Sequence, residues 1–231
     1  MNEKQKEFLL LQINDALFPI GGYSHSYGLE TYIQKELVGS PESAKSYIEH
    51  TLLYNTSYTD LLAVRLAYEY TLQKNITEIE KLEEILTAVK TPMEIRLASF
   101  KLGARFMKTV GTFQINYENS IFKEYYQSNR NRKAHHTIAY GVFCGCVGIS
   151  FTQMLKAYLY AQVSAIVTNC VKTIPLSQTV GQQMLFELHP LMEEVIELVK
   201  TLKPHDLGRT VPGFDIRAMQ HEVLYSRLYM S

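Results

Sequence analysis

Apolar residues recur every three or four positions along most of this chain, and no stretch alternates convincingly between apolar and polar residues. Recurrence at three and four positions is typical of amphipathic helices, whereas strict alternation indicates strands. In the run from Thr77 to Val89, for example, Ile79, Leu82 and Leu86 fall on one helical face. We therefore predict an all-α fold, a single-domain bundle of about ten helices around a buried, glycine-rich central helical hairpin.

Serine, threonine, proline and glycine mark where these helices begin and end. Ser40 followed by Pro41 is a start signal, because serine caps the first turn and proline fits its first position. Thr77 with Glu80 is expected to form a capping box, and Ser177 to cap a later helix. The expected helices span roughly residues 3–17, 24–35, 40–54, 57–72, 77–89, 91–113, 117–127, 138–150, 151–171, 178–188, 190–202 and 215–227.

The stretch from His135 to Gln182 is the expected centre of the fold. Residues 138–151 carry no charge. Gly141, Gly145 and Gly148 lie three or four positions apart in that stretch, so on a helix they share one face. Without side chains on that face, another backbone can approach it closely.

The second half of this centre is expected to be a buried helix. Ser150 is its predicted cap, residues 151–171 are apolar almost all round, and Pro175 prevents continuation. The uncharged run before it has about 14 residues, short of the roughly 20 that span a bilayer. This length favours a core hairpin over a membrane segment.

Composition narrows the class of protein. Lys plus Arg and Asp plus Glu both number 23, and a net charge of zero argues against general binding to nucleic acid or anionic membranes. The cysteines, Cys144, Cys146 and Cys170, lie in apolar helical contexts, which suits a reducing compartment without disulfides. The polar start MNEKQKE is not a secretory signal. We expect a cytoplasmic protein.

Residues that could carry chemistry are few. His135 and His136 could seed a metal site, although adjacent histidines at a helix entry are more often surface residues. Cys144 and Cys146 are two apart and point to nearly opposite sides of a helix, so they cannot easily bind one ion. The common nucleotide, zinc-protease and serine-hydrolase motifs are absent from the sequence. A helical small-molecule enzyme with a buried pocket stays an alternative.

Three stretches together resemble the UreF family of urease accessory proteins. They are Leu9–Gln34 (LLLQINDALFPIGGYSHSYGLETYIQ), Ala134–Gln182 with its His-led helix, Tyr-Leu-Tyr helix and Pro-Leu-x-Gln turn, and the ending HEVLYSRLYMS. Their order and spacing match the family along nearly the whole chain. One departure is Thr137, where many members carry proline.

The resemblance implies a non-catalytic, all-helical homodimer. It implies that the chain binds the accessory protein UreD, also called UreH, and recruits the GTPase UreG to deliver nickel to apo-urease. No resident cofactor and no metal ligand are expected in this chain, although nickel could pass through the assembly.

The docking tail is the first of three candidate surfaces. Pro204, Gly208, Pro212 and Gly213 predict a linker, which divides residues 1–202 from a segment 203–231 that docks on a partner. The predicted UreD contacts in this segment are Ile216, Met219, Val223, Leu224, Tyr225, Arg227, Leu228 and Tyr229.

The other two surfaces lie within the helical body. Tyr23 on the first Pro-Gly turn, with Gln178 and Gln182 after Pro175, is predicted to contact UreG, because partner contacts concentrate on rigid loops of a scaffold. Lys156 and Tyr160 share one helical face and are the predicted homodimer contacts.

Overall fold

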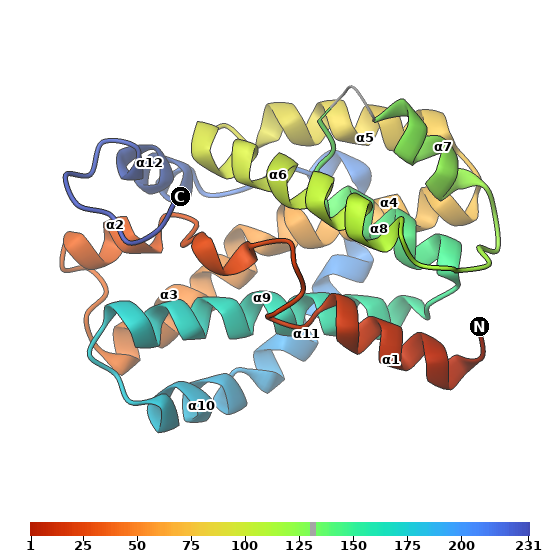
Figure 1. Cartoon of the computed structure of the whole chain (residues 1–231). Helices are drawn as coiled ribbons and strands as arrows, with labels where there is room; N and C mark the ends of the chain where they lie inside the picture. The colour runs from red at the N-terminus through yellow and green to blue at the C-terminus, as the bar shows by residue number, and fades with distance from the viewer. Residues whose placement is uncertain (130–132) are drawn as a thin grey trace.

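The fold is all-α, as the sequence predicts. The computed structural model describes residues 1–129 and 133–231, with Tyr23 described by its backbone alone, and within these residues it contains helices and no strand. Figure 1 shows them packed as one body. The α-helices are α1 Glu3–Ile13, α2 Leu29–Gln34, α3 Pro41–Tyr54, α4 Asp60–Leu72, α5 Ile76–Val89, α6 Met93–Val110, α7 Ile121–Ser128, α8 His136–Val147, α9 Phe151–Thr173, α10 Gln178–Glu187, α11 His189–Thr201 and α12 Pro212–His221. Short 3-10 helices are η1 Gly22–Ser24, η2 Thr56–Tyr58 and η3 Pro204–Asp206.

Three predicted helix starts are confirmed by their capping bonds. The Ser40 side chain accepts a hydrogen bond from the Ser43 amide with Pro41 in the first turn. Ser150 likewise caps α9, and Ser177 caps α10. These caps are local, because each involves residues within three positions, and this is why sequence alone locates them.

Other predicted boundaries are wrong, each for a local reason. Helix α1 ends at Ile13 rather than Leu17, because Asn14 leaves the helical conformation and donates to the Tyr140 hydroxyl at 2.9 Å. Asn75, not Thr77, caps α5. Gly28 in the left-handed region precedes α2, in place of a serine cap. The last helix begins at Pro212 and ends at His221, so residues 222–231 are non-helical.

Helix α8 is the most buried element of the fold. All twelve of its residues are buried, between α4 and α6. A Cβ at Gly141 would lie 2.5 Å from the Val64 carbonyl oxygen, and one at Gly145 would lie 2.9 Å from the Thr71 side chain, so both glycines allow α4 to approach closely. Gly148 does not share this face, contrary to prediction, because it ends the helix with φ of +73°.

The segment 203–231 packs against the helical body. Helix α12 contacts α2 and α6, and Figure 1 places the C-terminus beside them. The Ser26 and Tyr27 amides donate to the Ser231 carbonyl oxygen at 2.6 and 3.1 Å. The last residue of the chain therefore lies against the loop that precedes α2.

The described helices include none with the length and apolar character that crossing a membrane requires.

Candidate partner-binding surfaces

A buried polar cluster fastens the C-terminal segment to the body. His221, fully buried, places Nδ1 2.7 Å from Glu94 Oε2 of α6 and Nε2 3.1 Å from Glu30 Oε2 of α2. Arg227 donates to the other oxygen of Glu94 at 2.7 Å. We call Glu30, Glu94, His221 and Arg227 the tail anchor.

Glu30 also holds the backbone beyond α12. It accepts hydrogen bonds from the amides of Leu228 at 2.8 Å and Tyr229 at 3.2 Å. Backbone amides must be paired when they leave water. The Glu30 carboxylate pairs two such amides in a non-helical segment. The anchor therefore fixes the path of the last residues.

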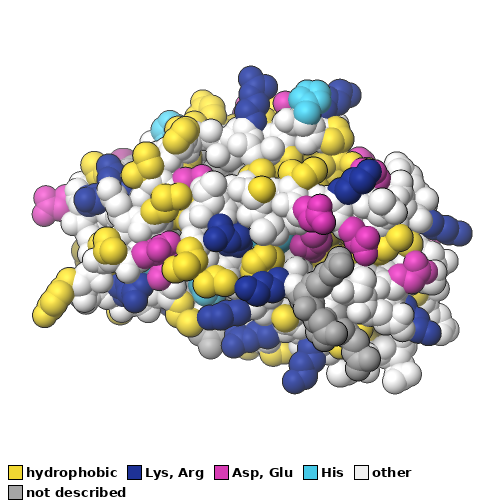
Figure 2. Space-filling model, turned by 90° about the horizontal axis from the view of Figure 1, so that it is seen from above, with side chains coloured by type: hydrophobic (Ala, Val, Ile, Leu, Met, Phe, Trp, Pro, Cys, Tyr) yellow, Lys and Arg dark blue, Asp and Glu magenta, His cyan; other side chains and the backbone are white. Residues whose placement is uncertain are grey.

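The outer side of the same segment is apolar and exposed. Val223, Tyr225 and Leu228 have exposed fractions of 83%, 106% and 77%, and Ile216 and Met219 are also exposed. Leu224 is half-buried, whereas Tyr229 is buried against the body. In Figure 2, apolar side chains are frequent over the left-hand end, where α2 and α12 lie in Figure 1, between charged side chains of both signs.

The two turns predicted to contact UreG lie on opposite sides of α9. Asn169 of α9 donates to the His25 carbonyl oxygen beside η1 at 3.0 Å. Gly181 of α10 lies against Val167 and Val171. Because Asn169 is two positions from each of these valines, it points to the other side of the helix.

Within these turns, the described side chains of α10 form one exposed row. Gln178 and Gln182 are exposed, and Phe186, one further turn along, has an exposed fraction of 71%. The Tyr23 side chain lies outside the described residues, and its backbone forms part of η1. The four-residue spacing from Gln182 is the signal that could have added Phe186 to the prediction.

The predicted dimer contacts continue onto a second helix. Lys156 and Tyr160 are exposed on α9, and α1 runs alongside α9, with Gln153 donating to Glu7 at 3.5 Å. Phe8 and Leu11 of α1 have exposed fractions of 73% and 68%. The sequence alone did not indicate that α1 would supply exposed apolar side chains next to α9.

Comparison with known proteins identifies the family. The sequence profile of UreF matches residues 38–189. The urease accessory protein UreF of Haemophilus influenzae is 37% identical over 227 residues, covering 96% of this chain and 94% of that relative. UreF proteins of Bacillus sp. strain TB-90 and Actinobacillus pleuropneumoniae are 36% and 35% identical over 96% of this chain and 97% of each relative. The chain belongs to the UreF family.

Members of the UreF family are named accessory proteins, so this chain is an accessory protein of urease and not an enzyme. The family resemblance drawn from three sequence stretches is thereby confirmed. The individual partners, the homodimer and the nickel path stay predictions.

In this UreF-family chain, the tail anchor is what sequence reasoning missed. His221 and Glu222 alone were too sparse to indicate a site. The partners of His221 lie 127 and 191 positions earlier, in α6 and α2. No local spacing signals such a cluster, because it depends on the chain returning to its own beginning.

The paired histidines are buried, not on the surface as expected. His135 bonds to Ser99 at 2.9 Å and Thr87 at 3.0 Å, and burial lowers its pKa to about 3. Burial also lowers the pKa of His136 to about 4. Both rings are therefore neutral at physiological pH. The described residues contain no group of three or more His, Cys, Asp or Glu side chains arranged to bind a metal ion.

The three cysteines are buried and unbonded to one another. The Cys146 sulfur accepts from the Phe122 amide at 3.2 Å and donates to Asn119 at 3.1 Å, which ties α8 to the start of α7. Burial raises the pKa of Cys146 to about 12, so it remains a protonated thiol. A structural role fits these contacts.

Proposed function

We propose that this chain is a dimeric scaffold of urease maturation, which binds UreD (UreH) through its C-terminal segment and recruits the GTPase UreG. In this proposal it acts in the cytoplasm, and nickel is the cargo delivered to apo-urease. The observation that carries it is the two-sided C-terminal segment, whose inner side is fastened by the tail anchor while its outer side exposes apolar residues.

The outer side has the composition of a protein-binding patch. Tyr225 with Val223 and Leu228 supplies aromatic and aliphatic side chains that water covers in the free chain. Such side chains dominate binding energy when a partner buries them, with tyrosine among the enriched types. Arg227 lies at the rim, paired with Glu94. Tyr229, which is buried, would position the segment rather than contact UreD.

The test uses point variants of the outer side. Removing residues 215–231 entirely would also strip Glu30 and Glu94 of their partners, so a binding loss would be ambiguous. A triple variant, Val223→Asp, Tyr225→Ala and Leu228→Asp, changes only exposed side chains. We expect UreD affinity to fall about 100-fold or more, since a few central side chains each contribute on the order of 2 kcal/mol.

The control is Ile85→Asp on α5, where an apolar side chain is 49% exposed far along the sequence from the tail. It should bind UreD normally in the same co-purification assay. Unchanged UreD binding by the triple variant, with normal circular dichroism, would refute the docking role of the tail.

UreG recruitment is assigned to η1 and to α10. Gln178 and Gln182, with Phe186 beside them, offer amides and one aromatic ring from a rigid helix. Tyr23 belongs to η1, whose last residue Ser24 accepts from the Met230 amide, and Ser26 shortly after it donates to Ser231. UreD bound on the tail would therefore be coupled to this turn through these bonds.

Separate variants test the two parts of this surface. Since α9 separates them, Tyr23→Ala and the pair Gln178→Ala with Gln182→Ala should each weaken UreG recruitment to a preformed complex with UreD. Dimerisation and UreD binding should be kept. If UreG binds normally to a chain that carries Tyr23→Ala, Gln178→Ala and Gln182→Ala together, its surface lies elsewhere.

The homodimer is assigned to the joint face of α9 and α1. Lys156→Ala with Tyr160→Ala should shift the chain toward monomer in light scattering, and Phe8→Ser should do so independently, because it removes an exposed aromatic ring from the same face. Phe186→Ser is the matched control, an equally exposed phenylalanine on α10. An unchanged dimer in both α9 and α1 variants would exclude this face.

A further inference from the structure

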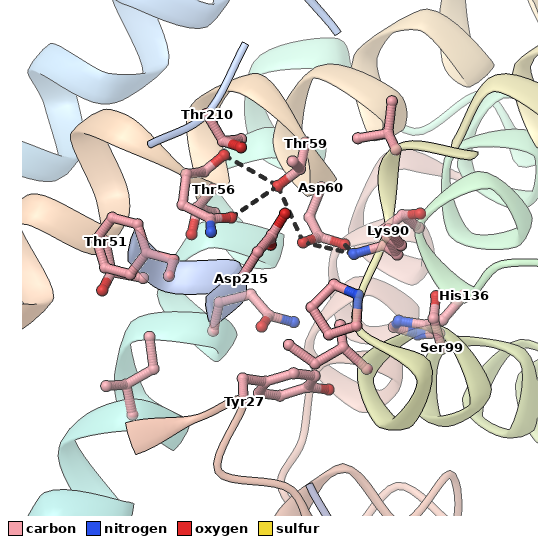
Figure 3. A pocket seen from close by; sticks show the side chains of 18 of the residues that line it. Tyr27, Thr51, Thr56, Thr59, Asp60, Lys90, Ser99, His136, Thr210 and Asp215 are labelled. Atoms are coloured by element: carbon pink, nitrogen blue, oxygen red, sulfur yellow. Dashed lines mark hydrogen bonds and ion pairs between the residues drawn. The ribbon is translucent and has the colours of Figure 1, made fainter. Parts of the chain in front are cut away.

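Four helices begin around one cavity of about 100 Å³. The lining includes Thr59 and Asp60 at the start of α4, Pro92 before α6, His136 and Thr137 at the start of α8, and Thr210 before α12, as the close view in Figure 3 shows for the labelled members. A helix start leaves backbone N–H groups without helical partners and carries a partial positive charge. None of these four starts has a capping hydrogen bond from an N-cap side chain.

Two polar side chains at the start of α8 have no protein partner. His136 Nε2 and Thr137 Oγ1 are buried without a hydrogen bond, although both residues line the cavity and are only 8% and 2% exposed. The neighbouring His135, by contrast, uses both ring nitrogens. Leaving a buried polar atom unpaired is destabilising, so two such atoms side by side on a cavity wall indicate a site for a bound group.

The charges on the wall limit how much negative charge a bound group can carry. Lys90 pairs with both oxygens of Asp60 at 2.8 and 3.1 Å, and Asp215 accepts from Thr91 at 2.7 Å. Both carboxylates are thus already bonded, and groups that can donate remain beside them at the start of α8: the Thr137 hydroxyl, the neutral His136 ring and the helix-start amides. Asp60 and Asp215 repel any anion, and a dianion also costs far more to take out of water, so a monoanion is the charge best matched to the field of the helix starts.

We propose that this cavity binds a small, singly charged oxyanion of the carboxylate type, held by Thr137 Oγ1 and His136 Nε2 at the start of α8. One water needs about 10–15 Å³ of such volume, so a cavity of about 100 Å³ holds a ligand of a few heavy atoms together with water. The lining includes Thr210, Phe214 and Asp215 of the C-terminal segment, but none of the residues predicted to contact UreD.

The experiment uses sodium formate as the probe on the full chain. Thermal unfolding is followed at rising formate with sodium chloride replacing it at constant ionic strength, and sodium sulfate serves as the dianion comparison. We expect formate to raise Tm saturably, and carbon-13 formate to show line broadening with the folded chain. Sulfate should give no saturable rise.

The informative variants are matched threonines. Thr31 Oγ1 of α2 is also buried and unpaired but lies outside the cavity lining. Thr137→Val should need about tenfold or more formate for the half-maximal effect, because a hydrogen bond to a charged group is lost. Thr31→Val should respond as the unmodified chain does.

Several results would overturn the site. These are the absence of a saturable formate effect and of line broadening in the unmodified chain, an equal response of Thr137→Val, or equal loss in Thr31→Val. The first of these outcomes means that the cavity holds water alone. This outcome is measured on the unmodified chain, so the test does not require any variant to fold.

Discussion

Two buried glutamates hold chain segments in place, and their surroundings differ. Glu83 of α5 accepts from the Tyr125 hydroxyl and from the His135 amide at the entry of α8, and both donors are neutral. Glu30 of α2 accepts from two tail amides and meets His221, within reach of Arg227 through Glu94. Burial raises the pKa of Glu83 to about 8. Burial near α8 therefore disfavours the ionised form of Glu83, whereas Glu30 at the tail lies beside the ionisable side chain of His221.

The two regions are stabilised by different kinds of contact. Helix α8 is held mainly by apolar burial and by glycines that admit α4, and its polar contacts, such as Asn14 to Tyr140, are few. The tail buries little apolar surface of its own and depends on a few directed bonds. Directed bonds are lost together when one member is removed, so the tail is the part of the chain that a single substitution can release.

The largest effect is expected from Glu30→Ala. It removes the acceptor of two backbone amides and one partner of His221, so docking of residues 222–231 should weaken by about 3 kcal/mol, because buried donors are left without an acceptor. Hydrogen exchange measured by mass spectrometry should show the tail amides exchanging faster while α8 stays protected. Glu84→Ala, an exposed glutamate of α5, is the control. Equal protection of the tail in both variants would contradict the anchor.

The next effect concerns α8. Gly141→Ala places a methyl group where Val64 O would be 2.5 Å away, and a helix backbone cannot yield as a side chain does. Overpacking of this kind should cost about 2–3 kcal/mol in urea unfolding. Gly39→Ala, with nothing within 4 Å of the new carbon, should stay near the unmodified value. Similar losses in both would show that close approach of α4 is not the cause.

The pH dependence of stability tests whether Glu83 is protonated in the folded chain. The folded pKa of Glu83, about 8, lies above its ordinary value of 4.5, so its contribution is complete below pH 4.5 and is lost as pH rises toward 8. Glu83→Gln should abolish this loss, up to about 1.4 kcal/mol per pH unit between those limits. Urea unfolding at several pH values measures it. Parallel curves for Glu83→Gln and the unmodified chain would contradict a protonated Glu83.

The histidines at the start of α8 act in the opposite direction. Their folded pKa values, about 3 and about 4, lie below the ordinary 6.5, so their contribution is present above pH 6.5 and is lost as pH falls toward 4. This loss should persist in Glu83→Gln. One pH series therefore distinguishes Glu83 from the two histidines, because stability from Glu83 is lost as pH rises and stability from the histidines is lost as pH falls.

The smallest effect is expected on the outer side of the tail. Val223→Ser changes a side chain with an exposed fraction of 83%, so the free energy of unfolding should move by less than about 0.5 kcal/mol. A calorimetric Tm near that of the unmodified chain is the expected measurement. A clear loss would mean that Val223 packs within the chain and is not available to a partner.

Much of the fold was predictable because its signals are local. Helix periodicity, the caps at Ser40, Ser150 and Ser177, and the burial of the uncharged stretch around Gly141 depend on residues within about four positions of one another. The predicted start of α5 was wrong because Asn75, and not Thr77, caps that helix. The exposed residues Val223, Gln178 and Tyr160 could be named as candidates because polar or terminal context favours the surface.

The all-α class, the UreF family, the burial of α8 and the principal helix starts can all be inferred from the amino-acid sequence. The contacts of His221 with Glu30 and Glu94, the packing of the tail on α2 and the cavity among four helix starts become visible in the folded chain. The reason is physical. Periodicity and capping depend on neighbours along the chain, whereas the pairing of buried polar groups depends on which distant segments the packing of apolar faces brings together.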